Sequence, residues 1–205
     1  MSKAVLISIQ PKWCEKIANG KKTIEVRKNR PEMQTPFKCY IYCTLPPNSE
    51  LFTHGGIREY ASELLRLQSG EIVYDYGMRV CCDPEHRPFS KDNFLCQKVI
   101  GEFVCDGIEE FHADEIPFGE YEIDDDSLVA TCLQLDELWA YGKGATLYGW
   151  RISDLVIYDR PKDLDEFHYA AETIKRRTKG KTWIKVSDLN DGIKRPPQSW
   201  CYVEV

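Results

Sequence analysis

Apolar residues along this chain predict many short strands and few helices, and the two do not alternate. Apolar runs of strand length predict strands over residues 3–9, 22–28, 37–44, 98–108, 148–158 and 199–205. Helical spacing predicts helices over residues 11–18, 56–67 and 133–141, with a turn or short helix at 164–167 and a hairpin near 74–81. A doubly wound sheet needs a helix between most strands. We therefore expect an α+β fold, a small mixed or antiparallel β-barrel with helices packed at its openings.

Residues 45–97 interrupt the succession of strands. The 205 residues are enough for one domain with a substantial core. We therefore expect a single domain over residues 1–205 with an insertion at 45–97. No apolar run approaches the roughly 20 residues of a membrane helix, and the first residues do not resemble a secretory signal. These features predict a cytoplasmic protein with no membrane partner.

The charge is divided unevenly along the chain. The formal net charge of −6 argues against a nucleic-acid partner, but residues 99–142 hold 13 acids and no lysine or arginine. The other 161 residues hold 27 bases and 20 acids. The acidic balance is thus local, residues 109–126 are expected to form an acidic loop, and a basic face remains compatible with the composition.

Nine cysteines, an odd number, do not suggest a disulfide framework in a chain of this kind. The one cluster with mixed metal-binding residue types is Cys81, Cys82, His86 and Cys96, and it lacks the second tight pair of a zinc site. Asp124, Asp125 and Asp126 lack the alternation of a calcium loop. We predict neither a metal nor a cofactor.

The sharpest local motif is Gly20-Lys21-Lys22-Thr23-Ile24-Glu25-Val26-Arg27. Strand alternation places Thr23, Glu25 and Arg27 on one face and the apolar Ile24 and Val26 on the other. Such a polar row suits the wall of a cleft, where lysine and arginine hold phosphates or base edges. The alternative interpretation is a solvated ladder of charges on an exposed strand.

A second basic run, residues 174–185, holds six bases and no acid. It suits a phosphate backbone, with a tryptophan that stacks on a base. A flexible, solvated loop is the alternative interpretation. The candidate backbone contacts are Lys175, Arg176, Arg177, Lys179, Lys181 and Trp183.

The segment ISIQPKWCEKIANGKKTIEVRK resembles the opening of ASCH domains, members of the PUA-like superfamily. Three further segments are similar to the same group: KVIGEFVCDGI, YGWRISDLVIYDRPKDLDEF and RPPQSWCYVEV. Together they spread over most of the chain outside residues 45–97. Many chains of this group resemble phage or prophage proteins, so the resemblance also implies an origin of that kind.

The resemblance implies a PUA-like barrel with an RNA or nucleotide cleft. The family's cleft is lined by the Gly-Lys-Lys-Thr turn and the Glu-x-Arg strand, which match Lys21, Lys22, Thr23, Glu25 and Arg27 here. Its surrounding wall is expected to include Lys12, Trp13, Trp150, Ser153, Gln198, Ser199 and Trp200. Trp150, in the strand expected at 148–158, and Trp200, in the strand expected at 199–205, suit the core equally well.

One small relative of this superfamily hydrolyses N4-acetylcytidine with a lysine and a threonine of a similar motif. Lys22 matches that lysine, but Glu25 stands where the threonine would be, so the hydroxyl nucleophile is missing. A Lys22–Glu25 pair remains able to activate water. Other relatives are linked to RNA cleavage.

Three functions therefore stay open. The first is a module that binds RNA or a modified nucleotide. One positive groove formed by the basic segments 12–28 and 175–185 would favour this function and the next, whereas segments on opposite sides would remove the main physical support for RNA binding. The second is a nucleoside amidohydrolase or ribonuclease with Glu25 as base and Lys22 as electrostatic stabiliser. The third is a phage protein that docks a protein partner through residues 45–97 or the acidic stretch.

Overall fold

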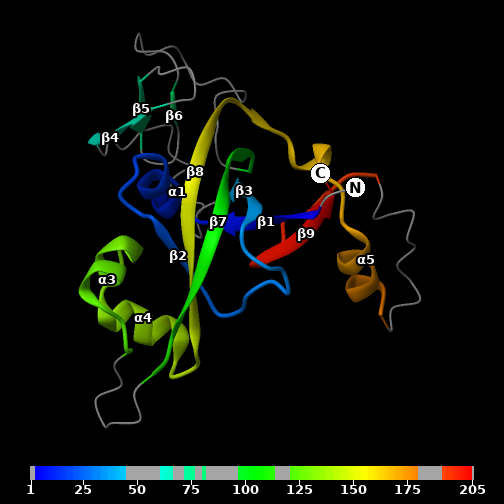
Figure 1. The fold of residues 1–205 in the computed structure, drawn as a ribbon. Helices are drawn as coiled ribbons and strands as arrows, with labels where there is room; N and C mark the ends of the chain where they lie inside the picture. Colours follow the sequence, from blue (N-terminus) through cyan, green and yellow to red (C-terminus); the bar gives the residue numbers. More distant parts are fainter. Residues whose placement is uncertain are drawn as a thin grey trace.

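A six-stranded mixed sheet forms the centre of the computed structural model, which describes residues 3–44, 61–66, 72–76, 80–81, 97–113, 121–179 and 191–204. The strands lie in the order β2-β8-β7-β3-β1-β9. The pair β1–β3 is parallel, and the other neighbours are antiparallel. Figure 1 shows β7 and β8 as a long pair crossing the molecule. The bounds are β1 Lys3–Ile9, β2 Ile24–Arg27, β3 Phe37–Cys43, β7 Val99–Phe111, β8 Leu147–Lys162 and β9 Trp200–Glu204.

Short helices lie around this sheet. They are α1 Pro11–Ala18, α3 Asp125–Thr131, α4 Leu135–Gly142, the 3-10 helix η2 Leu164–Glu166 and α5 Ala171–Thr178. A second sheet consists of β4 Ala61–Arg66, β5 Ile72–Tyr76 and β6 Val80–Cys81, in that order. None of the described helices is both long and apolar enough to cross a membrane.

The class α+β is confirmed, but the described strands do not close into a barrel. Within those residues β2 and β9 are the two end strands, and they do not pair with each other: β2 pairs with β8, and β9 pairs with β1 and, through one isolated bridge, with Tyr169. The sheet gains curvature from register shifts in the β7–β8 pair.

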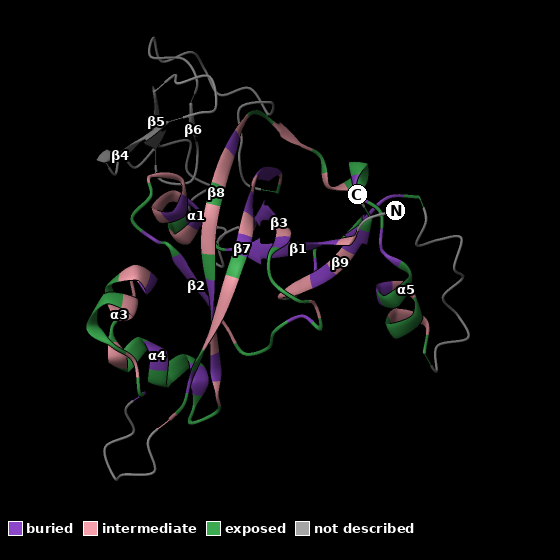
Figure 2. Cartoon of the chain, viewed as in Figure 1, coloured by how far each residue is buried: buried purple, intermediate pink, exposed green. Residues whose placement is uncertain are grey.

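The first strand explains how the two faces of the sheet are filled. Because successive side chains alternate, Val5 and Ile7 face one side and Ala4 and Leu6 the other, and all four are fully buried. Val5 and Ile7 pack with Cys14 and Ile17 of α1, whereas Ala4 and Leu6 pack in the cluster that α5 contacts. The helices α1 and α5 thus cover opposite faces of β1, and Figure 2 shows β1 buried between them.

One predicted helix is wrong. Residues 56–67 carry apolar residues at helical spacing, yet β4 runs through Ala61–Arg66 and pairs antiparallel with β5. Pairing with a neighbouring strand overrides the local helical pattern. The hairpin predicted near 74–81 is confirmed by the antiparallel pair β5–β6.

The acidic loop predicted at 109–126 is also corrected. Strand β7 continues to Phe111, and α3 begins at Asp125. The Asp124 side chain accepts a hydrogen bond from the Ser127 backbone N–H at 2.9 Å, an ordinary helix N-cap. The run of aspartates is therefore a cap and first turn, where acids are favoured by the helix dipole.

Candidate functional site

A cleft of about 780 Å³ opens where β1, α1, β2 and α4 meet the segment before β9. Its lining combines charged, aromatic and backbone groups from parts of the chain that are far apart in sequence. The lining residues are Ser8, Gln10, Trp13, Lys22, Glu25, Val26, Arg27, Thr44, Leu133, Glu137, Ala140, Tyr141, Pro196, Pro197, Gln198 and Ser199.

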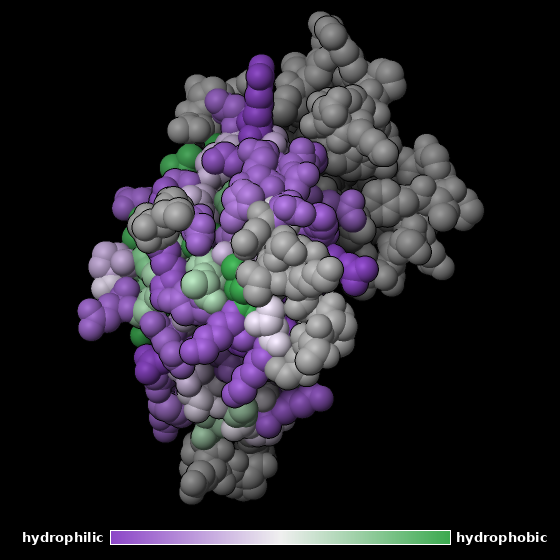
Figure 3. All heavy atoms as spheres, turned by 90° about the vertical axis from the view of Figure 1, so that its right-hand side faces the viewer, coloured by the Kyte–Doolittle hydropathy of each residue, from purple (hydrophilic) through white to green (hydrophobic). Residues whose placement is uncertain are grey.

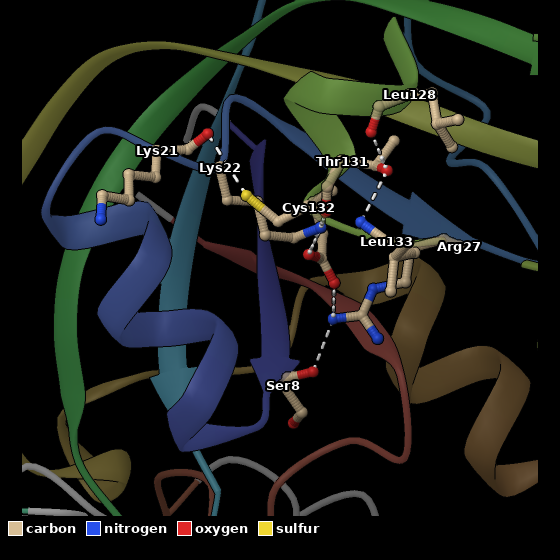
Figure 4. A network of polar contacts seen from close by, with 9 residues as sticks. Ser8, Lys21, Lys22, Arg27, Leu128, Thr131, Cys132 and Leu133 are labelled. Atoms are coloured by element: carbon tan, nitrogen blue, oxygen red, sulfur yellow. Dashed lines mark hydrogen bonds and ion pairs between the residues drawn. The ribbon is translucent and has the colours of Figure 1, made fainter. Parts of the chain in front are cut away.

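Three charged side chains that line this cleft form a linked group. Lys22 Nζ lies 3.4 Å from Glu25 Oε2, and Arg27 Nη2 lies 3.0 Å from Glu25 Oε1. The same Arg27 Nη2 donates to the Ser8 carbonyl at 2.7 Å (Figure 4). The side chains of Lys22, Glu25 and Arg27 are 2%, 6% and 12% exposed, respectively. A solvated ladder of charges is therefore excluded for these three residues.

The turn before β2 brings Lys22 to the same side as Glu25. Strand alternation alone would place Lys22 on the opposite face, but β2 begins only at Ile24. Gly20 has a φ of 77°, a left-handed conformation that glycine adopts without strain, and Lys22 N–H donates to the Lys16 carbonyl. The Gly-Lys-Lys-Thr motif thus works as a turn that directs its second lysine inward.

The C-terminus of α3 holds the Lys22 ammonium. Lys22 Nζ donates to the Thr131 carbonyl at 2.6 Å, across 109 positions of sequence (Figure 4). Carbonyls at a helix C-terminus carry partial negative charge, which favours a cation there. Because Thr131 lies in the acidic block and α4 follows it, this block faces the cleft and builds one of its walls.

The buried charges do not balance. Two buried cations face one buried carboxylate, while a second carboxylate, Glu137, lies on the cleft lining and balances the charge of the site as a whole. Glu25 Oε2 makes no hydrogen bond among the described residues but is ion-paired with Lys22, whereas Arg27 Nε is buried with no hydrogen-bond partner among them. Buried polar groups normally have a partner, so this N–H is a candidate donor to a ligand in the cleft.

Aromatic rings with adjacent cations occupy two walls of the cleft. Lys12 Nζ lies 4.2 Å from the ring centroid of Trp13 on α1, and Lys28 Nζ lies 4.9 Å from that of Tyr141 on α4. Tyr141 is 38% exposed, and Trp13 is half-buried. Exposed rings of this kind stack on bases, while neighbouring lysines attract phosphates.

Several residues predicted from the sequence lie outside the cleft lining. Thr23 is exposed, and its backbone bonds with α3 and β8. Ser153 Oγ donates to the Val104 carbonyl at 3.0 Å, and Lys21 is exposed with its carbonyl accepting from Cys132 Sγ. Lys12 is exposed beside Trp13. Gln198 and Ser199, in contrast, line the cleft as expected.

Trp150 belongs to the core rather than to a binding wall. It is fully buried, pairs in register with Glu25 and packs edge-on against Phe37 with ring centroids 5.9 Å apart. Trp200 packs on it at 5.9 Å. The expectation that Trp150 binds substrate is corrected, because its neighbours on the sheet fill the space around its ring.

The basic run from residue 174 lies away from the cleft. Residues 175–178 form the last turn of α5, so this part of the run is a helix and not the solvated loop of the alternative interpretation. Because α1 and α5 cover opposite faces of β1, the described parts of the two basic segments do not form one groove, and the support expected from a shared groove is missing. Lys175, Arg176 and Lys179 are exposed, whereas Lys181 and Trp183 lie outside the described residues.

Ten of the sixteen lining residues were not predicted from the sequence. Four of them, Leu133, Glu137, Ala140 and Tyr141, come from the acidic block, as does Thr131, which binds Lys22; the net charge of this block directed attention away from a basic site. The capping pair Gln134–Glu137 at the start of α4 is a local signal that could have placed this helix. Nothing local indicates that Thr131 meets Lys22.

Metal and thiol chemistry find little support in the residues described. Among them no group of three or more histidine, cysteine, aspartate or glutamate side chains could hold a metal ion. The predicted cluster Cys81, Cys82, His86 and Cys96 lies outside the side chains that the structure describes. Burial raises the pKa of the Cys105 and Cys201 thiols to about 12, so both stay protonated at neutral pH.

Comparison with known proteins supports the resemblance seen in the opening segment. The model of the ASCH domain matches residues 7–42, which include the last three residues of β1, all of α1 and β2, and most of β3. The family resemblance is confirmed over this part, which carries Lys22, Glu25 and Arg27. No curated protein matches the chain.

Solved structures of one bacterial protein are similar in arrangement. The ASCH protein from Zymomonas mobilis has 16% identity and a TM-score of 0.48, covering 98% of this chain and 87% of that one. Its serine-to-alanine variant has 15% identity, a TM-score of 0.48 and coverages of 98% and 88%. Its tyrosine-to-phenylalanine variant has 16% identity and a TM-score of 0.47, covering 99% of this chain and 91% of that one. These low scores leave the site to be argued from its own geometry.

Proposed function

We propose that the cleft binds an unpaired nucleotide of RNA, including a modified one. The observation that carries this proposal is the buried Lys22–Glu25–Arg27 group lining a cleft whose walls hold Trp13 and Tyr141. A base stacks on either ring while the polar group meets its edge, and Lys12 and Lys28 beside the two rings favour an attached phosphate. Duplex RNA is a poor fit, because its bases are stacked and their edges are paired.

The two lysines beside the aromatic walls add to this proposal. Lys12 and Lys28 lie where a phosphate next to a bound base would reach them, so binding should weaken as salt rises. A cytoplasmic location is part of the proposal, and it fits the six cysteines with described side chains, none of which forms a disulfide. An origin in a phage or prophage, and the insertion at 45–97, stay predictions.

Replacing Arg27 by alanine tests the binding proposal. We expect the affinity for a labelled RNA pentamer to fall about ten- to a hundredfold, the usual loss for a charged hydrogen bond. Fluorescence anisotropy in two salt concentrations measures this loss, with mononucleotides and N4-acetylcytidine as competitors. Arg30→Ala is the matched control, since Arg30 lies three residues further on, is 54% exposed and pairs with Glu110. Equal affinity of the two variants would contradict the proposal.

Hydrolysis is the second candidate function, and the observation behind it is the Lys22–Glu25 contact in the cleft. The geometry favours it less than binding. Both carboxylate oxygens of Glu25 already face a cation, Oε2 facing Lys22 Nζ at 3.4 Å and Oε1 facing Arg27 Nη2 at 3.0 Å, so neither is open to activate a water molecule. The nearest hydroxyl of the motif, Thr23, lies outside the cleft lining, although Ser8, Thr44, Tyr141 and Ser199 bring hydroxyls to it.

The hydrolytic candidate makes its own prediction. If Glu25 acts as a base, Glu25→Gln should slow the release of acetate from N4-acetylcytidine, or the cleavage of labelled RNA, by about 10²- to 10⁴-fold. Chromatography of the products measures both reactions. Activity that survives this substitution removes Glu25 as the base. A protein-interaction function stays a prediction, because most of residues 45–97 lie outside the described residues.

A further inference from the structure

The segment 191–199 connects the cleft with the basic helix α5. Its last four residues, Pro196 to Ser199, line the cleft. Its middle reaches α5 through one side chain: Tyr169 Oη donates to the Arg195 carbonyl at 3.3 Å and accepts from Arg177 Nη1 at 2.8 Å. The segment leads directly into β9, whose other side is hydrogen-bonded to residues 168–170 just before α5.

The segment and α5 together form a positively charged surface. Residues 171–179 and 191–199 hold six bases and two acids. One acid, Glu172, is paired with Lys3 at 2.7 Å. Lys175, Arg176, Lys179, Lys194 and Arg195 are exposed, and Arg177 is fixed against the Tyr169 ring at 4.8 Å. Figure 3, which faces the side of the molecule that carries α5, shows that hydrophilic residues cover much of it.

The packing of α5 leaves its cations available. The helix is attached to β9 through Thr173, whose hydroxyl donates to the Tyr202 carbonyl and accepts from the Tyr202 N–H, both at 3.0 Å. Thr173 is buried and Ile174 partly buried, so this side of the helix supplies the anchor. Arg176 and Lys179 have no share in that anchor and are exposed, so they can contact a ligand while they also favour the helix dipole at the end of α5.

We infer that α5 and the segment 191–199 form a track for the phosphate backbone of single-stranded RNA whose unpaired base occupies the cleft. The inference rests on the proposed function and adds that the ligand is a strand of several nucleotides rather than a free nucleotide. Ser199 lies four positions after Arg195, so the chain between them spans at most about 14 Å. At the helical rise of about 3.4 Å per nucleotide of one strand, three or four phosphates cover that distance.

This arrangement explains why two basic segments on opposite faces of β1 serve one ligand. The cleft holds one nucleotide, and the neighbouring part of the RNA strand lies along the segment 191–199 and α5. Phosphate contacts contribute affinity without sequence information, so the track should act equally on any sequence of sufficient length. Its contribution should vanish for a ligand too short to leave the cleft.

The test compares two lengths of labelled oligouridine, 3 and 12 nucleotides, by anisotropy over a series of salt concentrations. In Arg176→Gln/Lys194→Gln, we expect the affinity for the 12-mer to fall about tenfold and its salt slope to decrease by about 1.4, at roughly 0.7 per phosphate contact. The affinity for the 3-mer should stay unchanged. Arg151→Gln/Arg160→Gln removes the same charge from two exposed positions on β8 and should change neither.

The outcomes separate the inference from the proposed function. If the 12-mer loses no affinity in the track variant, or loses as much in the β8 variant, the track is wrong. If the wild-type protein binds both lengths and only Arg27→Ala weakens them, the cleft proposal stands and the track alone is overturned. If neither length binds to the wild-type protein, both fall. Circular dichroism of each variant verifies that the fold is retained.

Discussion

Replacing Glu25 by alanine is expected to lower the free energy of unfolding by about 3–5 kcal/mol. The substitution leaves Lys22 and Arg27 buried together with no carboxylate between them, and an unpaired buried charge is far more costly than a lost contact. Urea denaturation followed by circular dichroism measures the effect. Glu204→Ala, at an exposed position on β9, should stay within about 0.5 kcal/mol of the wild-type protein.

A double variant makes this prediction sharper. Lys22→Met/Glu25→Leu removes one charge of each sign and fills similar volume but leaves Arg27 with only the Ser8 carbonyl, so we expect it to recover part of the stability that Glu25→Ala loses. It should nevertheless bind RNA weakly, since two of the three charged groups that meet the base are gone. A loss below 1 kcal/mol for Glu25→Ala would mean that the two cations reach water and that the group is less enclosed than its exposure indicates.

Trp150→Ala is expected to have an effect of similar size. Removing this fully buried ring leaves a cavity beside Phe37 and Trp200, and changes of this kind cost about 3–5 kcal/mol. Trp150→Phe should lower the free energy of unfolding much less. An aromatic ring remains in the core, and the substitution removes an indole N–H that has no hydrogen-bond partner among the described residues. Thermal and urea denaturation measure both.

The comparison of the two Trp150 variants also decides what the residue does. If it packs the core, Trp150→Phe retains RNA affinity as well as most of the stability. A Trp150→Phe variant that folds normally but binds RNA tenfold less well would return this residue to the binding wall, against the placement found here.

The opening unit of the fold was predictable because its signals are local. Pro11 at the start of α1, the stop at Asn19-Gly20 and the alternation of Ile24 and Val26 each act within a few residues, and β1, α1 and β2 lie where these patterns placed them. Glu25 and Arg27 entered the candidate site by the same alternation. Local signals also predicted most of the long strands.

The remaining features depend on contacts between distant segments. The spacing at 56–67 indicates a helix, and only pairing with β5 makes Ala61–Arg66 a strand. The sequence predicts a loop that includes the aspartates at 124–126, although Asp124 caps α3. The Lys22–Thr131 bond and the cleft wall at Pro196 to Ser199 have no local signature at all. The view of residues 45–97 as an insertion stays a prediction.

The pairing of β1 with β9 has a consequence for how the protein is made. Strand β1 forms hydrogen bonds with β9, which lies almost 200 residues later in the sequence, and the residues just before β9 complete the cleft. A nascent chain on the ribosome therefore exposes this side of β1 until β9 has been synthesised. The motif near residue 22 emerges well before Thr131 and Ser199, the residues that complete its surroundings. A chain that terminates before Ser199 lacks this wall of the cleft, so we expect it not to compete for the ligand.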